Sequence, residues 1–181
     1  MRRIRKEDVL LVVVDVQGKL ARLVWRHEDL FERLGTLVKG LRALGVPIVW
    51  TEQVPEKLGP TVPEVAALLD GLVPLAKSSF SCCGAAEFMR QIEDSGRSVI
   101  VLAGIETHVC VYQTALDLLD AGKHVEIVED AVSSRTEENR QAALRRLSAM
   151  GAGLTTVEML LFELQKIAEG DSFRLLNRLV R

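Results

Sequence analysis

The stretch Val99-Ile100-Val101-Leu102-Ala103-Gly104-Ile105-Glu106-Thr107-His108-Val109-Cys110 decides the fold that this sequence predicts. Its first half consists mainly of β-branched apolar residues, which is typical of a strand buried on both faces. Gly104 ends that strand, and residues 109–122 are predicted to form a helix with Thr107 as its N-cap. We therefore expect Cys110 in the first helical turn beyond a central strand, where unpaired N–H groups and the helix dipole favour a thiolate.

Length, composition and charge limit the class of protein. The chain has 181 residues, a net charge of −2 and 48% hydrophobic residues, so we expect one domain over residues 1–181 with a full core. A charge this close to zero favours neither nucleic acid nor an anionic membrane as a partner. The apolar run at 9–14 is too short to span a bilayer and has no cleavage-like site after it. The cysteines are odd in number and do not make a disulfide framework, so we expect a cytoplasmic protein.

Apolar segments alternate with helical ones along the whole chain. Strands are predicted at residues 9–14, 46–51, 72–76, 99–103, 125–128 and 154–157, and the main helices at 29–44, 63–69, 87–94, 109–122, 137–150 and 159–180, the last one interrupted around Gly170. This alternation indicates a parallel sheet covered on both faces, for which right-handed crossovers favour the strand order 3-2-1-4-5-6. Pro74 falls within the third strand, and a proline suits an edge position because its missing N–H breaks no ladder bond there.

The same order brings three chemically useful side chains towards one end of the sheet. Strands one and four are neighbours at the switch point, so Asp15 and Cys110 follow adjacent strand ends, where ligands bind in such sheets. Lys77 follows strand three, about 10 Å from strand one at the usual strand spacing, which is within reach of its long side chain. Cys110 is the predicted nucleophile, Asp15 the proton acceptor and donor, and Lys77 a cation that favours both charged partners.

Each of these residues also has a purely structural interpretation. Cys110 could be an inert buried thiol, Asp15 a turn cap and Lys77 a solvated surface residue. A Cys–His dyad is not expected, because His108 is two residues from Cys110 and residues two apart on a helix do not face each other. The histidines lack metal-ligand spacing, and the segment after strand one is not a Gly-rich dinucleotide motif, so no metal and no cofactor are predicted.

Three ordered segments resemble the isochorismatase-like cysteine hydrolases over nearly the whole chain. They are Val12-Val13-Val14-Asp15-Val16-Gln17, Lys77-Ser78-Ser79-Phe80-Ser81 and Gly104-Ile105-Glu106-Thr107-His108-Val109-Cys110-Val111. Three further segments are similar to the subgroup called isochorismatase domain-containing proteins: Thr51-Glu52-Gln53, Leu58-Gly59-Pro60-Thr61-Val62 and Asp130-Ala131-Val132-Ser133-Ser134-Arg135.

The resemblance implies a three-layer α/β/α sandwich and a catalytic triad of Asp15, Lys77 and Cys110. It implies hydrolysis of an amide or related C–N bond of a small molecule through an acyl-enzyme on the cysteine. It also implies a cis peptide bond between Ile105 and Glu106, and an oxyanion hole made by the N–H groups of Glu106 and Cys110. The family is commonly oligomeric, so a homo-oligomer is expected.

Two departures from relatives narrow the expected activity. Nicotinamidase relatives carry a metal site of an aspartate and histidines after strand two, whereas this chain has Trp50-Thr51-Glu52-Gln53 there, so a metal is not expected. Isochorismatases that act on a vinyl ether lack the cysteine, so Cys110 argues against isochorismate. A nicotinamidase-like amidase and a non-catalytic oligomeric binding or scaffold protein remain as alternatives. Side chains that could line a substrate pocket, besides Glu106, are those of Gln17, Gln53, Phe80, His108 and Tyr112.

Overall fold

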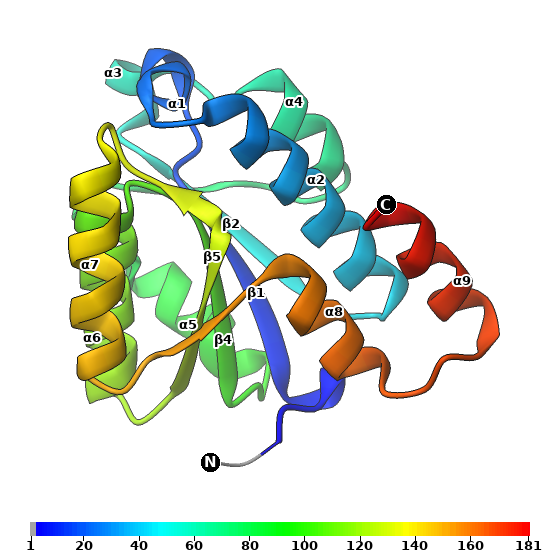
Figure 1. Cartoon of the computed structure of the whole chain (residues 1–181). Helices are drawn as coiled ribbons and strands as arrows, with labels where there is room; N and C mark the ends of the chain where they lie inside the picture. The colour runs from blue at the N-terminus through cyan, green and yellow to red at the C-terminus, as the bar shows by residue number, and fades with distance from the viewer. Residues whose placement is uncertain (1–2) are drawn as a thin grey trace.

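Six parallel strands form one sheet in the order β3-β2-β1-β4-β5-β6 in the computed structural model, which describes residues 3–181 (Figure 1). This confirms the predicted fold class and strand order. The strands are β1 (Val9–Val14), β2 (Ile48–Gln53), β3 (Leu75–Lys77), β4 (Val99–Ile105), β5 (His124–Ser133) and β6 (Gly153–Thr155).

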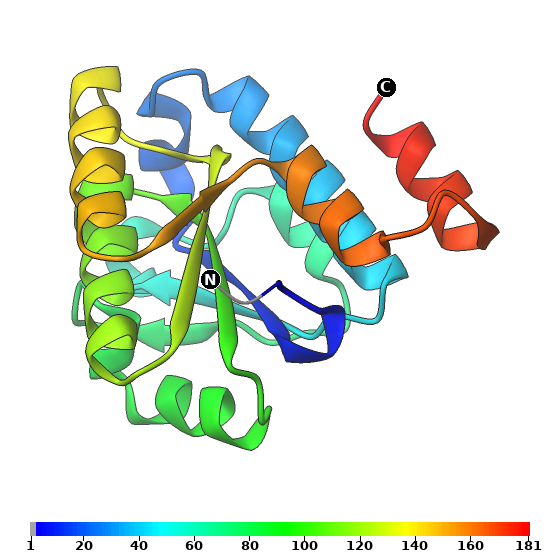
Figure 2. The same cartoon turned by 60° about the horizontal axis from the view of Figure 1, so that its bottom comes forward.

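Helices cover both faces of the sheet, as Figures 1 and 2 show. The core on one face joins the sheet to α2 (His27–Ala43), α8 (Val157–Gln165) and α9 (Gly170–Leu179). The core on the other face joins it to α5 (Ala86–Asp94), α6 (Tyr112–Asp120) and α7 (Glu137–Ala149). Every helix within residues 3–181 is too short or too polar to cross a lipid bilayer.

Shorter helical segments lie mainly in the connections. They are α1 (Gly18–Leu23), α3 (Pro55–Leu58), α4 (Pro63–Ala66) and the single turns η1 (Lys6–Asp8), η2 (Ala67–Leu69) and η3 (Cys82–Gly84). A π-helical turn, η4 (Thr107–Val111), connects β4 to α6. The prediction that Thr107 caps this helix is wrong: Glu106 occupies the cap position without a side-chain cap, and the buried Thr107 hydroxyl has no recorded partner among the described residues.

Only β1 has its predicted bounds, and the differences at β3 and β5 have identifiable reasons. β3 begins at Leu75, so Pro74 precedes the edge strand instead of lying within it, and the missing N–H falls outside the ladder. β5 runs to Ser133, beyond the predicted end at residue 128, because a register shift against β4 lets its last residues pair with Gly104 and Ile105. β6 pairs only with residues 126–128 of β5, so the carboxyl end of β5 extends past it.

A glycine lets the two central strands approach at the end where the predicted site lies. Gly104 pairs with Val14, and a Cβ atom on Gly104 would lie 2.2 Å from the Val14 carbonyl oxygen. Its φ of +111° is also one that L side chains rarely adopt. Because Asp15 follows Val14 and Cys110 comes six residues after Gly104, this close approach helps to bring the two side chains together.

We predict that Gly104→Ala lowers the free energy of unfolding by about 2–4 kcal/mol, since a methyl group would collide with β1 in addition to straining φ. Gly45→Ala is the matched control, because Gly45 has a φ of +73° but nothing within 4 Å of a built Cβ. It should lose only about 1 kcal/mol. Urea unfolding of both variants measures the difference, and equal losses would contradict the packing argument.

Candidate active site

The three predicted catalytic residues come from three strand ends. Asp15 follows β1 directly and has a left-handed backbone with φ of 49°. Lys77 is the last residue of β3, and Cys110 lies in the π-helical turn η4 after β4. The structure brings them together at the carboxyl edge of the sheet. Lys77 is ion-paired with Asp15, and the charges of both residues shift the pKa of the Cys110 thiol.

Lys77 and Asp15 form a buried ion pair. Lys77 Nζ lies 2.7 Å from Asp15 Oδ2, and the side chains are 0% and 5% exposed. The three N–H donors of the ammonium group go to Gln53 Oε1 at 2.7 Å and to the carbonyl oxygens of Ser79 and Phe80 at 3.1 and 3.0 Å. Asp15 Oδ2 has no hydrogen-bond donor among the described residues and is held by the charge of Lys77, which leaves the second oxygen, Oδ1, for a hydrogen-bond donor.

That second oxygen is held by a threonine. Thr51 Oγ1 donates to Asp15 Oδ1 at 2.7 Å, and Thr51 is 1% exposed. Sequence reasoning did not identify Thr51 as a site residue, because a threonine at a strand end has no chemistry of its own. The predicted pairing of the first two strands could have identified it, because Val14 pairs with Thr51 and Asp15 follows Val14.

Cys110 is 8% exposed and is a protonated thiol at neutral pH. The pKa of the thiol is raised to about 12, first by burial and then by the Asp15 carboxylate, whereas Lys77 lowers it. A hydrogen bond with Asp15 raises the pKa further, since the thiol donates to the carboxylate. The expectation that the helix start favours a thiolate is therefore wrong: burial and the adjacent negative charge outweigh the N–H groups and the lysine.

The peptide bond between Ile105 and Glu106 is cis, and it lies at the end of β4 just before η4. The side chain of Glu106 reaches the loop between β5 and α7. There its Oε1 accepts hydrogen bonds from the backbone N–H and the Nε of Arg135 at 3.1 and 3.0 Å. His108 Nδ1 lies 3.0 Å from Ser134 Oγ. Both side chains thus bind the segment after β5, beside the turn that carries Cys110.

Solved structures of other proteins are similar to this one over almost the entire chain. One is the structure described as MAR1 ribonuclease from Caenorhabditis elegans, with a TM-score of 0.92 and 33% identity over 99% of this chain and 92% of that chain. The YcaC gene product of Escherichia coli, described as an octameric hydrolase of unknown specificity, has a TM-score of 0.90 and 26% identity, covering 99% of this chain and 91% of that chain.

Sequence comparison identifies the family. The Isochorismatase domain model matches residues 9–159. Isochorismatase domain-containing protein 2 of Bos taurus is 40% identical over 179 residues, which are 99% of this chain and 86% of that protein. The chain belongs to the isochorismatase domain family. Its fold is that of isochorismatase-like hydrolases.

Within this isochorismatase domain, two of the predicted pocket residues, Gln17 and Gln53, form hydrogen bonds that hold the backbone and the lysine of the site. The Gln17 amide donates to the carbonyl oxygens of Gln53 and Gly59 at 3.1 and 2.7 Å, and its Oε1 accepts from the Gln53 N–H at 2.6 Å. Gln53 in turn binds Lys77 and donates to the Ser78 carbonyl at 2.8 Å. Both amides are thus engaged in holding backbone segments and the lysine.

The other predicted pocket residues lie differently. The Phe80 side chain is 55% exposed next to the carbonyl that binds Lys77. The Tyr112 hydroxyl accepts from Arg146 Nε of α7 at 3.1 Å, and the Arg146 guanidinium lies 5.7 Å from the Tyr112 ring centroid. Tyr112 therefore contacts α7, and the structure does not bring its hydroxyl to the triad.

The acidic residue near the end of β2, Glu52, is also hydrogen-bonded within the chain. Glu52 Oε1 accepts from the N–H and hydroxyl of Thr61 at 2.7 and 2.8 Å, which ties down the loop after β2. Within residues 3–181, no three His, Cys, Asp or Glu side chains come together as a metal site requires.

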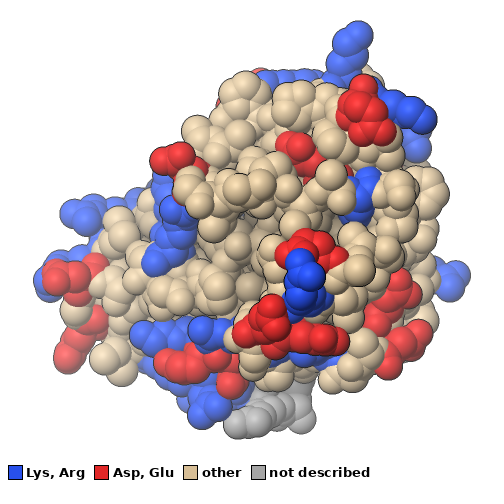
Figure 3. All heavy atoms as spheres, turned by 180° about the vertical axis from the view of Figure 1, so that it is seen from behind, with Lys and Arg blue, Asp and Glu red and all other residues tan. Residues whose placement is uncertain are grey.

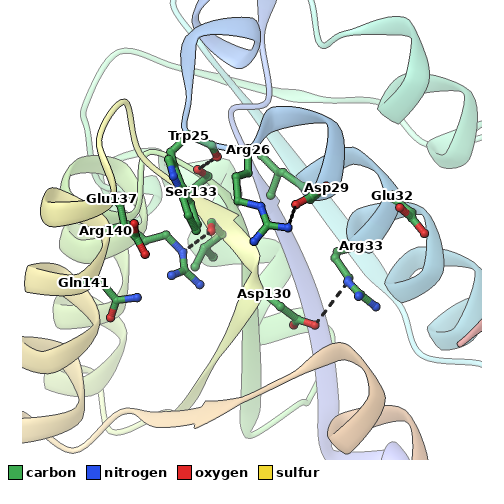
Figure 4. A pocket seen from close by; sticks show the side chains of 12 residues that line it. Trp25, Arg26, Asp29, Glu32, Arg33, Asp130, Ser133, Glu137, Arg140 and Gln141 are labelled. Atoms are coloured by element: carbon green, nitrogen blue, oxygen red, sulfur yellow. Dashed lines mark hydrogen bonds and ion pairs between the residues drawn. The ribbon is translucent and has the colours of Figure 1, made fainter.

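A hollow of about 340 Å³ lies between α2 and α7 (Figure 4). Its arginines already have partners: Arg26 pairs with Asp29, Arg33 lies 3.8 Å from Asp130, and Arg140 donates to the carbonyl oxygens of Val132 and Glu129. The hollow is lined by residues 25, 26, 29, 30, 32, 33, 130, 132, 133, 137, 140 and 141, which include none of the triad. A smaller hollow of about 200 Å³ is lined in part by Lys77.

We predict that Asp15→Asn lowers the pKa of Cys110 below its value of about 12, because the carboxylate charge that opposes thiolate formation is removed while Lys77 remains. The rate of Cys110 alkylation by iodoacetamide, followed by peptide mass spectrometry as a function of pH, measures this shift. Asp117→Asn is the control, since Asp117 raises the pKa of Cys83, which is about 11, and is not among the causes acting on Cys110. An unchanged or higher pKa of Cys110 in Asp15→Asn would refute the assignment.

Proposed function

We propose that the protein is a metal-independent cysteine hydrolase that cleaves an amide or related C–N bond of a small molecule through an acyl-enzyme on Cys110. The observation that carries the proposal is the buried Lys77–Asp15 pair, 2.7 Å apart, next to the Cys110 thiol. A nucleophile adjacent to a base that is itself held by a third group is the arrangement that covalent catalysis requires. Membership of a hydrolase family supports the same conclusion.

The first half-reaction uses the thiol and the carboxylate together. Asp15 accepts the proton of Cys110 as the sulfur attacks the substrate carbonyl carbon, forming a C–S bond and a tetrahedral oxyanion. The N–H groups of Glu106 and Cys110 are the proposed donors to that oxyanion. As the oxyanion collapses, the C–N bond breaks, and the proton on Asp15 passes to the leaving nitrogen as ammonia or an amine departs.

The second half-reaction releases the acid. Asp15, again a carboxylate, accepts a proton from a water molecule that attacks the thioester carbonyl. The C–S bond then breaks, the sulfur takes the proton back through Asp15, and the carboxylic acid product leaves. Lys77 keeps its charge throughout, which stabilises the Asp15 carboxylate and the developing thiolate.

The high pKa of Cys110 is compatible with this mechanism because the proton leaves during the attack. A thiol with a pKa of about 12 is almost fully protonated at neutral pH, so a resting thiolate is not the reacting species. Its hydrogen bond with Asp15 places the base where the proton must go. Burial of the thiol also protects it from reagents that attack thiolates.

A small molecule fits the surface better than a nucleic acid does. The relative from Caenorhabditis elegans is described as a ribonuclease. On the face of this chain seen in Figure 3, Lys and Arg side chains are interspersed with Asp and Glu instead of forming one basic stripe. The net charge of −2 agrees with this mixed surface.

We also assign the whole chain, residues 1–181, to a single domain of a cytoplasmic protein that needs no cofactor. Cys82, Cys83 and Cys110 are all free thiols, which suits a reducing compartment. Glu52 and Gln53, which stand where nicotinamidase relatives carry metal ligands, are used for Thr61 and Lys77, which favours metal-free chemistry.

We predict that Cys110→Ala abolishes hydrolysis, by roughly a thousandfold or more, while the fold persists. Ammonia release from small amides, ureides and carbamoyl compounds measures turnover, and an acyl adduct on the Cys110 peptide of quenched wild-type reactions identifies the intermediate. Cys83→Ala, a half-buried thiol outside the triad, should keep wild-type turnover.

Two outcomes would replace this proposal with one of its alternatives. No turnover of any of these compounds by the wild-type protein would favour a binding or scaffold protein with the same fold. Turnover of nicotinamide that is lost after treatment with a chelator and restored by zinc or iron would favour a metal-dependent nicotinamidase.

We further predict that the protein is a homo-oligomer in solution. Large apolar side chains are exposed, including Val73 at 83%, Leu23 at 67% and Met159 at 61%, and burying them between subunits is favourable. The YcaC relative is described as octameric. Light scattering should give a mass well above the 20.0 kDa of one chain, and a mass equal to one chain would contradict the prediction.

A further inference from the structure

Thr51 holds Asp15 at two points. The Asp15 N–H donates to the Thr51 carbonyl oxygen at 3.2 Å, and Thr51 Oγ1 donates to Asp15 Oδ1 at 2.7 Å. An ionised carboxylate can only accept, so the hydroxyl must be the donor. The two residues are 1% and 4% exposed, so bulk water does not replace this contact.

A second contact supports the direction of the hydroxyl. Cys82 Sγ lies 3.6 Å from Thr51 Oγ1, and because the Thr51 proton is directed at Asp15, the Cys82 thiol is the donor to Thr51. Burial raises the pKa of the Cys82 thiol, which keeps that proton in place. The Cys82 N–H donates to Thr114 Oγ1 at 2.9 Å and anchors the thiol on α6. The result is a directed chain of hydrogen bonds from Cys82 through Thr51 to Asp15.

The other groups around Asp15 show what the hydrogen bonds from Cys82 through Thr51 to Asp15 contribute. Lys77 of β3 approaches Oδ2 at 2.7 Å, the Cys110 thiol of η4 lies near enough for the carboxylate to raise its pKa, and Cys82 of η3 contacts Thr51. With Thr51 on Oδ1 and Lys77 on Oδ2, the carboxylate is held at both oxygens. Rotation about the bond that carries the carboxylate would break at least one of these contacts.

We propose that Thr51 is a positioning residue for the hydrolysis proposed above, on which this inference rests. It holds the Asp15 carboxylate in the orientation and the charge state in which the carboxylate takes the Cys110 proton. A carboxylate that loses a donor holds its proton more tightly and is free to turn. Thr51 touches neither the substrate carbonyl nor the nucleophile in this scheme and acts only through Asp15.

The kinetic test compares Thr51→Val, which keeps the shape and removes the hydroxyl, with Thr51→Ser, which restores it. For an amide that the wild-type protein hydrolyses, Thr51→Val should lower kcat by about 10- to 100-fold with little change in KM. Thr51→Ser should return kcat to near its wild-type value. Thr155→Val, at a 5% exposed threonine on β6, is the control and should leave kcat unchanged.

A second readout does not depend on activity. The carboxyl ¹³C signal of Asp15, assigned by its absence in Asp15→Asn, is recorded at pH 7 in protein labelled at aspartate. The signal should move in Thr51→Val, because the carboxylate oxygen loses its donor, and stay near its wild-type position in Thr51→Ser. An unmoved signal in Thr51→Val, or a loss of kcat that Thr51→Ser fails to rescue, would overturn the inference. A moved signal in a protein that hydrolyses no amide would support the contact between Thr51 and Asp15 while refuting the hydrolase.

Discussion

The buried ion pair between Lys77 and Asp15 is the interaction on which the site depends. Both side chains are almost fully removed from water, and the desolvation of each charge costs several kcal/mol. The fold offsets this cost by giving each charge further partners: Thr51 for the carboxylate, and Gln53 with the carbonyls of the following loop for the ammonium. A pair so surrounded is held in one geometry, and that geometry fixes the carboxylate next to the Cys110 thiol.

The need to give this ion pair hydrogen-bond partners explains why several polar side chains are buried around the site. Gln17 fixes the backbone at Gln53 and Gly59, Gln53 fixes Lys77, and Glu52 fixes Thr61. These side chains are buried and hydrogen-bonded to the protein itself. Gln17 and the last residues of β2 therefore support the backbone and the ion pair of the site.

The order of the sheet and the identity of the three central residues could be predicted, because both follow from strong patterns. Val9–Val14 is a continuous apolar run, so β1 has its predicted bounds, and the alternation of strands and helices leaves few topologies. The acid, the lysine and the cysteine follow three strand ends that this topology brings to one edge. A strand order thus predicts which residues meet, even when they are far apart in sequence.

The parts that were not predicted depend on packing. The pKa of Cys110 rises because the thiol is buried beside a carboxylate, and neither burial nor distance is visible in a helical pattern. The π-helical turn at Thr107 and the late start of β3 at Leu75 depend on which backbone groups find partners in three dimensions. No sequence motif singles out Thr51, and its hydrogen bond with Asp15 is visible only in the structure.

The protruding end of β5 has a consequence for the behaviour of the protein at high concentration. A strand that outruns its neighbour presents unpaired carbonyl and N–H groups, which can recruit a strand from another molecule and start aggregation. Here the guanidinium of Arg140, itself 9% exposed, covers the carbonyls of Glu129 and Val132. The Arg140 side chain thus covers the unpaired end of β5. The short β6 therefore leaves fewer free backbone groups with which a strand of another molecule could pair.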